Sequence, residues 1–322
     1  MLQQYFLRLE SDNSKYTYLL KARNIKYYKY YNLISYFDSF DYTKPLIILA
    51  PSIFNSPEIW FLTNNDTIVQ NILPNCNFYL IEWKQIEKEN FTLDDYALQI
   101  SEAIKKLFLW HGCKINLIGH CIGGTLAIAA CILTQQYINE LLLITTPWDF
   151  SHFQKFAIWG KNYNIFDFLL KLDHIPDSFF QIFFFLFSQD CILKKNIQYS
   201  KLKTEFQQKK FLAIERWQSS GQNLPRASFF QLLDKFIEKN IAKNNLWLIN
   251  NYTIKPTLLC SFVTLVFATK DKITPLSSVE DLINQIPFKQ IYNFDTGHLG
   301  FLIGSKNIEF NKFLLKWTKN LK

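Results

Sequence analysis

The feature that most constrains the fold of this chain is a series of short apolar runs separated by helical patterns. Within the early runs successive residues are apolar, which is typical of strands buried on both faces of a parallel sheet. The segments 93–110, 125–135 and 306–322 instead have apolar residues at helical spacing. This alternation predicts an α/β protein with a mostly parallel, doubly wound sheet. The predicted strands are Leu46–Ala50, Phe78–Glu82, Ile115–Ile118, Leu141–Ile144, Phe262–Ala268 and, more weakly, Gln290–Phe294.

The alternation stops after Phe150 and returns near residue 258. Between these points the sequence has aromatic-rich helical stretches, separated by Pro176, Pro225 and charged segments. We therefore predict a core formed by residues 1–150 and 252–322. A mainly helical cap, residues 151–251, is inserted into this core and folds over the sheet.

Charge and cysteine content exclude several classes of function. Lys and Arg exceed Asp and Glu by 35 to 27, but the positive residues are scattered, which indicates a solvated basic surface and no nucleic-acid partner. The six cysteines form no CxxC pair, so we expect neither a metal site nor a disulfide framework. We therefore expect the protein to lie in the reducing cytoplasm. The most apolar window, Phe179–Phe187, is shorter than the roughly 20 residues of a membrane span, and we expect no signal peptide.

The segment Gly119-His120-Cys121-Ile122-Gly123 joins a predicted strand to a predicted helix. This is the pattern of a nucleophile elbow, with cysteine in the usual position of serine. Side chains at the two glycine positions would collide across so sharp a turn. The amides at the start of the helix favour a thiolate at residue 121. The pattern predicts Cys121 as a nucleophile.

A nucleophilic cysteine needs a base, and the base needs a group that orients it. Asp271 and His298 each follow one of the last two predicted strands, where an open α/β sheet places its site. The resulting order, Cys…Asp…His, is that of the α/β-hydrolases. Asp295 is a rival for the acid, three residues before His298. The other histidines outside the elbow lie in a link or in the predicted cap: His111, His152 and His174.

An oxyanion hole requires two backbone donors aimed at one oxygen. One is expected to be the amide of Ile122, directly after the nucleophile. The other comes from the loop after the strand 46–50, where Pro51 has no amide hydrogen and Ile53 is the candidate. His120 is expected to contact substrate, with simple packing as the alternative.

Five segments in this order resemble motifs of the polyhydroxyalkanoate (polyhydroxybutyrate) synthases, a family of the α/β-hydrolase superfamily. Gly119–Gly124 is similar to the family's G-x-C-x-G-G box. The other matches are Ala50–Asn55 (V-P-P/S-L-I-N), Ile144–Phe150 (L-T-T-P-x-D-F), Asp271–Pro275 (D-x-I-x-P) and Gly297–Gly300 (G-H-x-G). The chain resembles a short form of the family that lacks the N-terminal domain.

The resemblance implies an acyltransferase that polymerises hydroxyacyl-CoA thioesters into a polyester, with no cofactor beyond the acyl-CoA substrate. Cys121 would carry the acyl chain, His298 would activate the thiol, and Asp271 would assist His298 or the incoming hydroxyl. Trp148 and Trp217 join His120 as expected substrate contacts, with packing as the alternative for Trp217. The implied partners are the growing polyester and either a separate synthase subunit or a second copy of the chain. The implied place is the cytoplasm, including the surface of polyester granules.

Two alternatives remain open from the sequence. The first is a hydrolase on the same fold, a thioesterase or polyester depolymerase, in which water takes the acyl group. The second is a non-enzymatic granule or membrane-surface protein that uses Phe179–Phe187 as its apolar face. The presence of Cys121, Asp271 and His298 in the correct order argues against the second.

Overall fold

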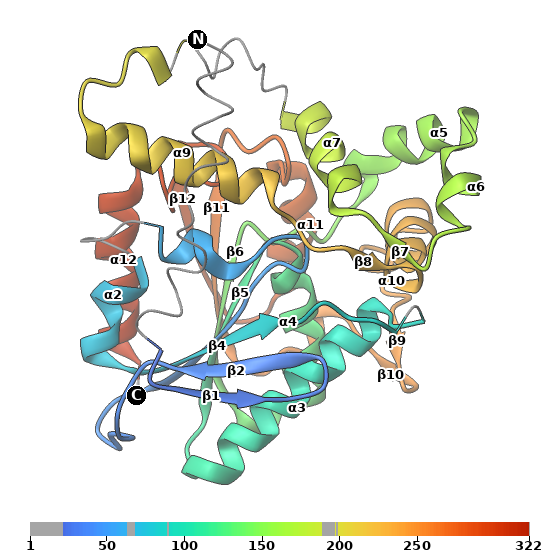
Figure 1. The fold of residues 1–322 in the computed structure, drawn as a ribbon. Coiled ribbons are helices and arrows are strands. Elements are labelled where there is room, and N and C mark those ends of the chain that lie inside the picture. The colour runs from blue at the N-terminus through green and yellow to red at the C-terminus, as the bar shows by residue number, and fades with distance from the viewer. Residues whose placement is uncertain (1–21, 63–67, 89, 189–196, 198, 322) are drawn as a thin grey trace.

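The computed structural model describes residues 22–62, 68–88, 90–188, 197 and 199–321. Its centre is an eight-stranded sheet in the order β1-β2-β4-β3-β5-β6-β11-β12 (Figure 1). The six strands from β4 to β12 in this order are parallel, and the edge hairpin β1–β2 is antiparallel. The strands are β1 Asn24–Tyr27, β2 Tyr31–Ser35, β3 Leu46–Ala50, β4 Asn77–Trp83, β5 Ile115–His120, β6 Ile138–Ile144, β11 Phe262–Ala268 and β12 Lys289–Phe294. The predicted α/β architecture with a mostly parallel sheet is confirmed.

Both faces of the sheet are covered, which explains the continuous apolar runs. Leu46 and Ile48 of β3 pack into a core layer with helices α3 (Leu93–His111) and α4 (Ile122–Leu133). Ile47 and Leu49 point to the opposite layer, with α2 (Ile68–Ile72) and α12 (Asn307–Asn320) (Figure 1). Alternate residues of one strand therefore enter different cores, so every position must be apolar.

The edge hairpin was not predicted. Residues of β1 are mostly exposed, while Tyr31 and Leu33 of β2 are buried against the rest of the sheet. The stretch 24–35 mixes lysine, asparagine and tyrosine, so it has neither a continuous apolar run nor a clear two-residue alternation. Pairing of β2 with the long strand β4, a contact distant in sequence, stabilises it instead.

The region between β6 and β11 consists of helices with short strand pairs. The helices are α5 Gln154–Asn162, α6 Ile165–Leu169, α7 Asp177–Ser188, α9 Glu205–Ser219, α10 Arg226–Gln231 and a π-helix over Leu232–Glu238. The short strands are β7 His174–Ile175, β8 Leu224–Pro225, β9 Leu248–Ile249 and β10 Tyr252–Thr253. Helix α11, Leu276–Gln285, lies outside this region, between β11 and β12. Phe150, Phe236 and Trp247 share one apolar core with the sheet. Since this core has no break, the boundaries of a separate cap stay a prediction.

The apolar window 179–187 belongs to α7. In its described part Phe180 is buried and Phe179, Phe183 and Phe184 pack against the core, while Ile182 is exposed. Most of these side chains therefore stabilise the fold and do not form an outward apolar face. In the part of the chain that the structure describes, we find no helix with the length and apolarity of a membrane span.

Asp149, shortly after β6, joins the region that follows it to the sheet. Its carboxylate lies 2.6 Å from the Lys243 ammonium and accepts a hydrogen bond of 2.7 Å from Asn240, and its side chain is 10% exposed. Burial would raise the pKa of Asp149, but Lys243 and the hydrogen bonds from Ser151 and Asn240 lower it to about 2. Its backbone carbonyl also accepts a hydrogen bond from Ser278 of α11.

We predict that Asp149→Asn lowers the free energy of unfolding at pH 7 by about 1–2 kcal/mol. The folded-state pKa lies below the unfolded value of about 3.9, so the contribution is present above that value and is lost as the pH falls toward 2. Urea unfolding at neutral pH and at about pH 3 measures both differences. A matched control is Asp234→Asn, whose exposed pair with Lys239 should contribute less than about 0.5 kcal/mol. An equal loss for Asp149→Asn at both pH values would contradict the prediction.

Candidate active site

Cys121 lies at a strained turn between β5 and α4. Its backbone has φ 54° and ψ −132°, a conformation that non-glycine residues rarely adopt. The turn is held by hydrogen bonds from the Cys121 amide to the Ile144 carbonyl, 2.9 Å, and from the Gly124 amide to the Cys121 carbonyl, 2.8 Å. Backbone strain of this kind persists only where the surrounding structure enforces it and is found at functional sites.

The glycines of the turn allow backbone segments to approach one another. A Cβ added to Gly119 would lie 2.6 Å from the Cα of Gly124, and one added to Gly123 would collide with the carbonyl of Pro51. The first turn of α4 therefore packs directly on the loop that follows β3. This contact brings the backbone of Ala50 and Pro51 next to the turn that carries Cys121.

His298 and Asp271 form a buried pair beside this turn. The His298 Nδ1 lies 2.6 Å from the Asp271 Oδ2, and the Asp271 side chain is inaccessible to solvent. The amides of Ile273 and Thr274 each donate to the other carboxylate oxygen at 2.8 Å. The Thr274 hydroxyl donates to Oδ2 at 2.8 Å and lies 2.9 Å from the His298 Nδ1. Four hydrogen bonds thus fix the carboxylate and aim it at the imidazole.

The electrostatics of the pair favour a positively charged His298. Burial would lower its pKa, but the negative charges of Asp271 and of a Cys121 thiolate raise it to about 10. Burial would likewise raise the pKa of Asp271, but the charge of His298 and the hydrogen bonds from Thr274 lower it below its ordinary value. His120, whose ring centroid is 6.0 Å from that of His298, has its pKa lowered to about 3 by burial and by the charge of His298. His120 is therefore neutral, while His298 can hold a proton next to Cys121.

The rival groups lie elsewhere. Asp295 is 65% exposed and pairs with Lys270 at 2.9 Å, so the structure brings Asp271 and not Asp295 to His298. The remaining histidines contact other groups: His111 the Tyr79 hydroxyl, His152 the carbonyl of Lys272 and His174 the carbonyl of Ile86.

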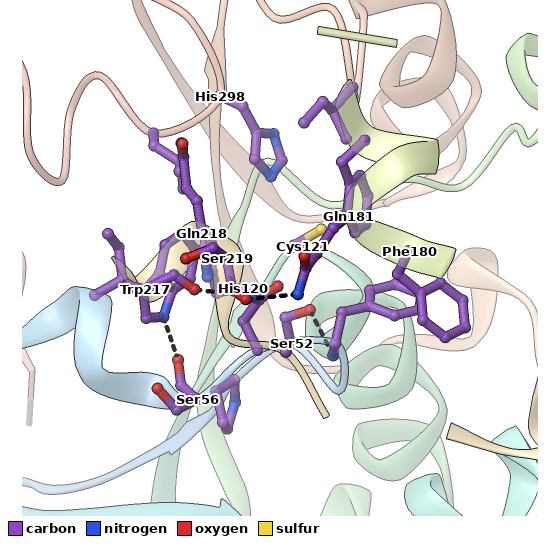
Figure 2. Close-up of a pocket in the computed structure, with 18 of the residues that line it drawn as sticks. Ser52, Ser56, His120, Cys121, Phe180, Gln181, Trp217, Gln218, Ser219 and His298 are labelled. Atoms are coloured by element: carbon purple, nitrogen blue, oxygen red, sulfur yellow. Dashed lines mark hydrogen bonds between the residues drawn. The ribbon is translucent and has the colours of Figure 1, made fainter. Parts of the chain in front are cut away.

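Cys121 and His298 line the same cavity, of about 790 Å³ (Figure 2). Its walls are mostly apolar, from Phe54, Trp60, Phe180, Phe184 and Trp217. Cavities of this size and lining are typical of small-molecule sites. Within the described residues no group of three or more His, Cys, Asp or Glu is arranged to hold a metal ion.

The predicted oxyanion donors lie beside the cavity. Ser52 and Cys121 line it, and Ile53 and Ile122 directly follow these two residues. The Ile53 side chain is buried in the core. The contact between Gly123 and Pro51 places the two backbone segments together. The assignment of the Ile53 and Ile122 amides stays a prediction.

The structure places two of the three expected substrate contacts in the cavity wall. His120 and Trp217 line the cavity, although both are largely buried. Trp148 does not line it, because this side chain is fully buried and packs against Trp247, with ring centroids 6.2 Å apart. In this structure Trp148 therefore belongs to the core, and the substrate role expected for it stays a prediction without support from the cavity.

Sequence analysis missed three polar residues that shape the site. Thr274 contacts both Asp271 and His298. Asn55 donates to the carbonyls of Trp217 and Ser220, each at 3.2 Å, and so ties the loop after β3 to the end of α9. Gln181 of α7 donates to the Ser219 carbonyl at 2.6 Å over the cavity (Figure 2). The position of Thr274 next to Pro275 in the motif D-x-I-x-P was the available signal, whereas the other two contacts join distant segments.

The sequence matches no known protein-family profile. It is similar to curated proteins named poly(3-hydroxyalkanoate) polymerase subunit PhaC. Identity to that of Haloarcula marismortui is 24% over 272 residues, 80% of this chain and 57% of the relative. Identity to that of Allochromatium vinosum is 23% over 272 residues, 81% of this chain and 76% of the relative. The chain is homologous to these polymerase subunits. The chain spans little more than half the length of the Haloarcula relative and of a further subunit PhaC, from Haloferax mediterranei.

Solved structures with the same fold include several hydrolases. A thioesterase domain from the curacin biosynthetic pathway has a TM-score of 0.56 at 14% identity, covering 91% of this chain and 98% of that one. A meta-cleavage product hydrolase from Pseudomonas fluorescens IP01 has a TM-score of 0.55 at 14% identity, covering 92% and 98%. At these identities the likeness establishes the fold, which is the α/β-hydrolase fold.

Trp217 offers a test of how the end of α9 supports the cavity. Its indole N–H donates to the Ser56 carbonyl at 2.8 Å, in the loop after β3 (Figure 2). Trp217→Phe retains much of the apolar contact and loses this hydrogen bond, so we expect acylation of Cys121 to slow by about three- to tenfold. Single-turnover kinetics with an acyl-CoA measures this. Trp159→Phe, on the exposed side of α5, is the matched control and should leave the rate unchanged. Equal rates for the wild type and Trp217→Phe would show that the hydrogen bond from Trp217 does not support the site.

Proposed function

We propose that this protein is an acyltransferase that forms a polyester from hydroxyacyl-CoA thioesters through a covalent adduct on Cys121. The observation that carries the proposal is a cysteine at the strained elbow of an α/β-hydrolase fold, in a chain homologous to poly(3-hydroxyalkanoate) polymerase subunits. The pair of His298 and Asp271 beside this sulfur supports it.

The choice of sulfur has a chemical reason. Attack of a thiolate on an acyl-CoA exchanges one thioester for another of nearly equal free energy, so the acyl group stays activated for transfer to a hydroxyl. A serine at this position would form an oxygen ester, which is a poorer acyl donor. A thiolate paired with an imidazolium is also a good nucleophile near neutral pH.

In the first step, the Cys121 thiol gives its proton to His298 Nε2, and the thiolate attacks the carbonyl carbon of the acyl-CoA. The C–S bond to CoA breaks, and the CoA thiolate leaves with the proton held by His298. Asp271 holds the imidazolium through Nδ1 during this exchange. The expected donors to the oxyanion are the amides of Ile122 and Ile53.

In the second step, the hydroxyl of another hydroxyacyl group attacks the thioester on Cys121. His298 takes the hydroxyl proton, a C–O ester bond forms, and the Cys121 thiolate is released. The apolar wall formed by Phe54, Phe180 and Phe184 suits an acyl or polyester chain. Lys270 and Lys272 line the same cavity and suit the phosphates of CoA. We also propose that the chain works with a partner, which is either a separate synthase subunit or a second copy of the chain.

The experiment incubates the purified chain with 3-hydroxybutyryl-CoA and follows free CoA together with the length of the acyl product. We expect release of CoA and products longer than one unit, and no release from Cys121→Ala. Release of CoA with only monomeric acid would replace the synthase with a thioesterase. No release, with or without an added synthase subunit, would contradict an enzymatic role.

A further inference from the structure

The side chain of Thr274 is neutral and contacts both members of the buried pair. Its hydroxyl oxygen lies 2.8 Å from the Asp271 Oδ2 and 2.9 Å from the His298 Nδ1, and those two atoms are 2.6 Å apart. The three atoms form a closed triangle in a region where Thr274 is almost fully buried. Water therefore does not substitute for these contacts.

The protons available to this triangle permit one arrangement. An ionised carboxylate only accepts hydrogen bonds, so the hydroxyl proton of Thr274 is donated to Asp271. The hydroxyl oxygen then presents a lone pair to the His298 Nδ1, as does Asp271. Two acceptors, the hydroxyl oxygen and the carboxylate oxygen, thus face Nδ1. An unprotonated Nδ1 would place its own lone pair against these two, so Nδ1 must carry a proton. His298 Nε2 is consequently the nitrogen that exchanges a proton with Cys121.

We propose that Thr274 is a positioning residue, whose hydroxyl fixes the His298 tautomer and orients the carboxylate of Asp271. The backbone supports this role, because the Thr274 amide donates to Oδ1 while its hydroxyl donates to Oδ2. One residue thus contacts both oxygens and sets the plane of the carboxylate. Pro275 follows directly and precedes α11, which fixes the backbone of Thr274 from its other side.

The dipole of the hydroxyl stabilises the charged form of the pair. Its hydrogen points to the anionic Asp271 and its oxygen to the cationic His298, so its removal should lower the pKa of His298. The other groups that face this imidazole are Cys121 and the neutral ring of His120, and Lys270 and Lys272 line the same cavity. None of these groups changes when the hydroxyl is removed.

The test compares Thr274→Val, which keeps the branched shape and loses the hydroxyl, with Thr274→Ser, which keeps the hydroxyl. NMR of isotope-labelled histidine, assigned with His298→Gln, gives the titration midpoint of His298. We expect Thr274→Val to lower this midpoint by about half a unit to one unit and to slow CoA release by about three- to tenfold. Thr274→Ser should restore both. Where the valine variant does not fold, Thr274→Ala removes the same hydroxyl and takes its place.

The outcomes separate this inference from the proposed function. Only the expected change in CoA release rests on the proposed function, and the expected change in the titration midpoint of His298 does not. A slower reaction with an unchanged midpoint, or a serine variant that restores neither quantity, would make Thr274 a packing residue and overturn the inference. A lowered midpoint that serine restores supports it even where the wild type releases no CoA from 3-hydroxybutyryl-CoA. In that case the proposed function fails and the positioning role stands.

Discussion

Cys121→Ala is expected to abolish the covalent acyl adduct, and Cys121→Ser is expected to lose well over nine-tenths of the turnover. In the proposed function Cys121 is the nucleophile that His298 activates, and the alanine variant lacks this nucleophile. A serine hydroxyl ionises far less readily than a thiol, so no stable pair with the imidazolium forms, and the oxygen ester it makes releases its acyl group slowly. Intact mass spectrometry after mixing with 3-hydroxybutyryl-CoA measures the adduct, and CoA release measures turnover.

The chain offers a matched control for this variant. Cys260 is exposed and does not line the cavity, so Cys260→Ala removes a free thiol without changing the site. This variant should form the adduct as the wild type does. An adduct that persists in Cys121→Ala would assign the nucleophile to another residue, and full turnover in Cys121→Ser would show that thiol chemistry is unnecessary.

The fold could be predicted because its strands are buried on both faces. The predicted strands at 46–50 and 262–268 have the observed bounds, and the other four differ only at their ends. The hairpin of Asn24–Tyr27 and Tyr31–Ser35 could not be predicted, because one of its strands is exposed and the other depends on pairing with β4. The continuous apolar runs therefore identified the central strands of the sheet but not the hairpin at its edge.

The site could be predicted only where its residues follow strand ends. Cys121, Asp271 and His298 follow β5, β11 and β12, and the parallel sheet brings these ends together. Trp148 also lies beyond a strand end, but its side chain is fully buried and packs against Trp247. The link between Asn55 and Trp217 spans 162 residues, and no local pattern in either segment indicates it. Strand order thus locates the candidate reacting groups. The directions of side chains and contacts between distant segments decide which other residues lie next to them.

Asp271→Asn is expected to lower the rate of acylation by about 10³–10⁴-fold, the size of the loss when a triad carboxylate becomes an amide. The asparagine can present an N–H to His298 Nδ1 and so favour the wrong tautomer. Loss of the carboxylate also removes the largest attraction that raises the pKa of His298, so this pKa should fall and the imidazolium should be less favoured near pH 7. Asp295→Asn is the matched control, because this exposed carboxylate pairs with Lys270 and does not contact the imidazole, and its rate should stay close to that of the wild type.

The same substitution predicts a change in how stability depends on pH. A raised folded-state pKa of His298 gives the wild type a contribution that is fully present below the unfolded value of about 6.5 and is lost as the pH rises toward 10. The free energy of unfolding of the wild type should therefore decline across this interval, and that of Asp271→Asn should decline much less. Urea unfolding at several pH values between these limits gives both curves. Parallel curves would mean that His298 gains no proton from its pairing with Asp271, and a thiolate at Cys121 would then lack its counter-ion.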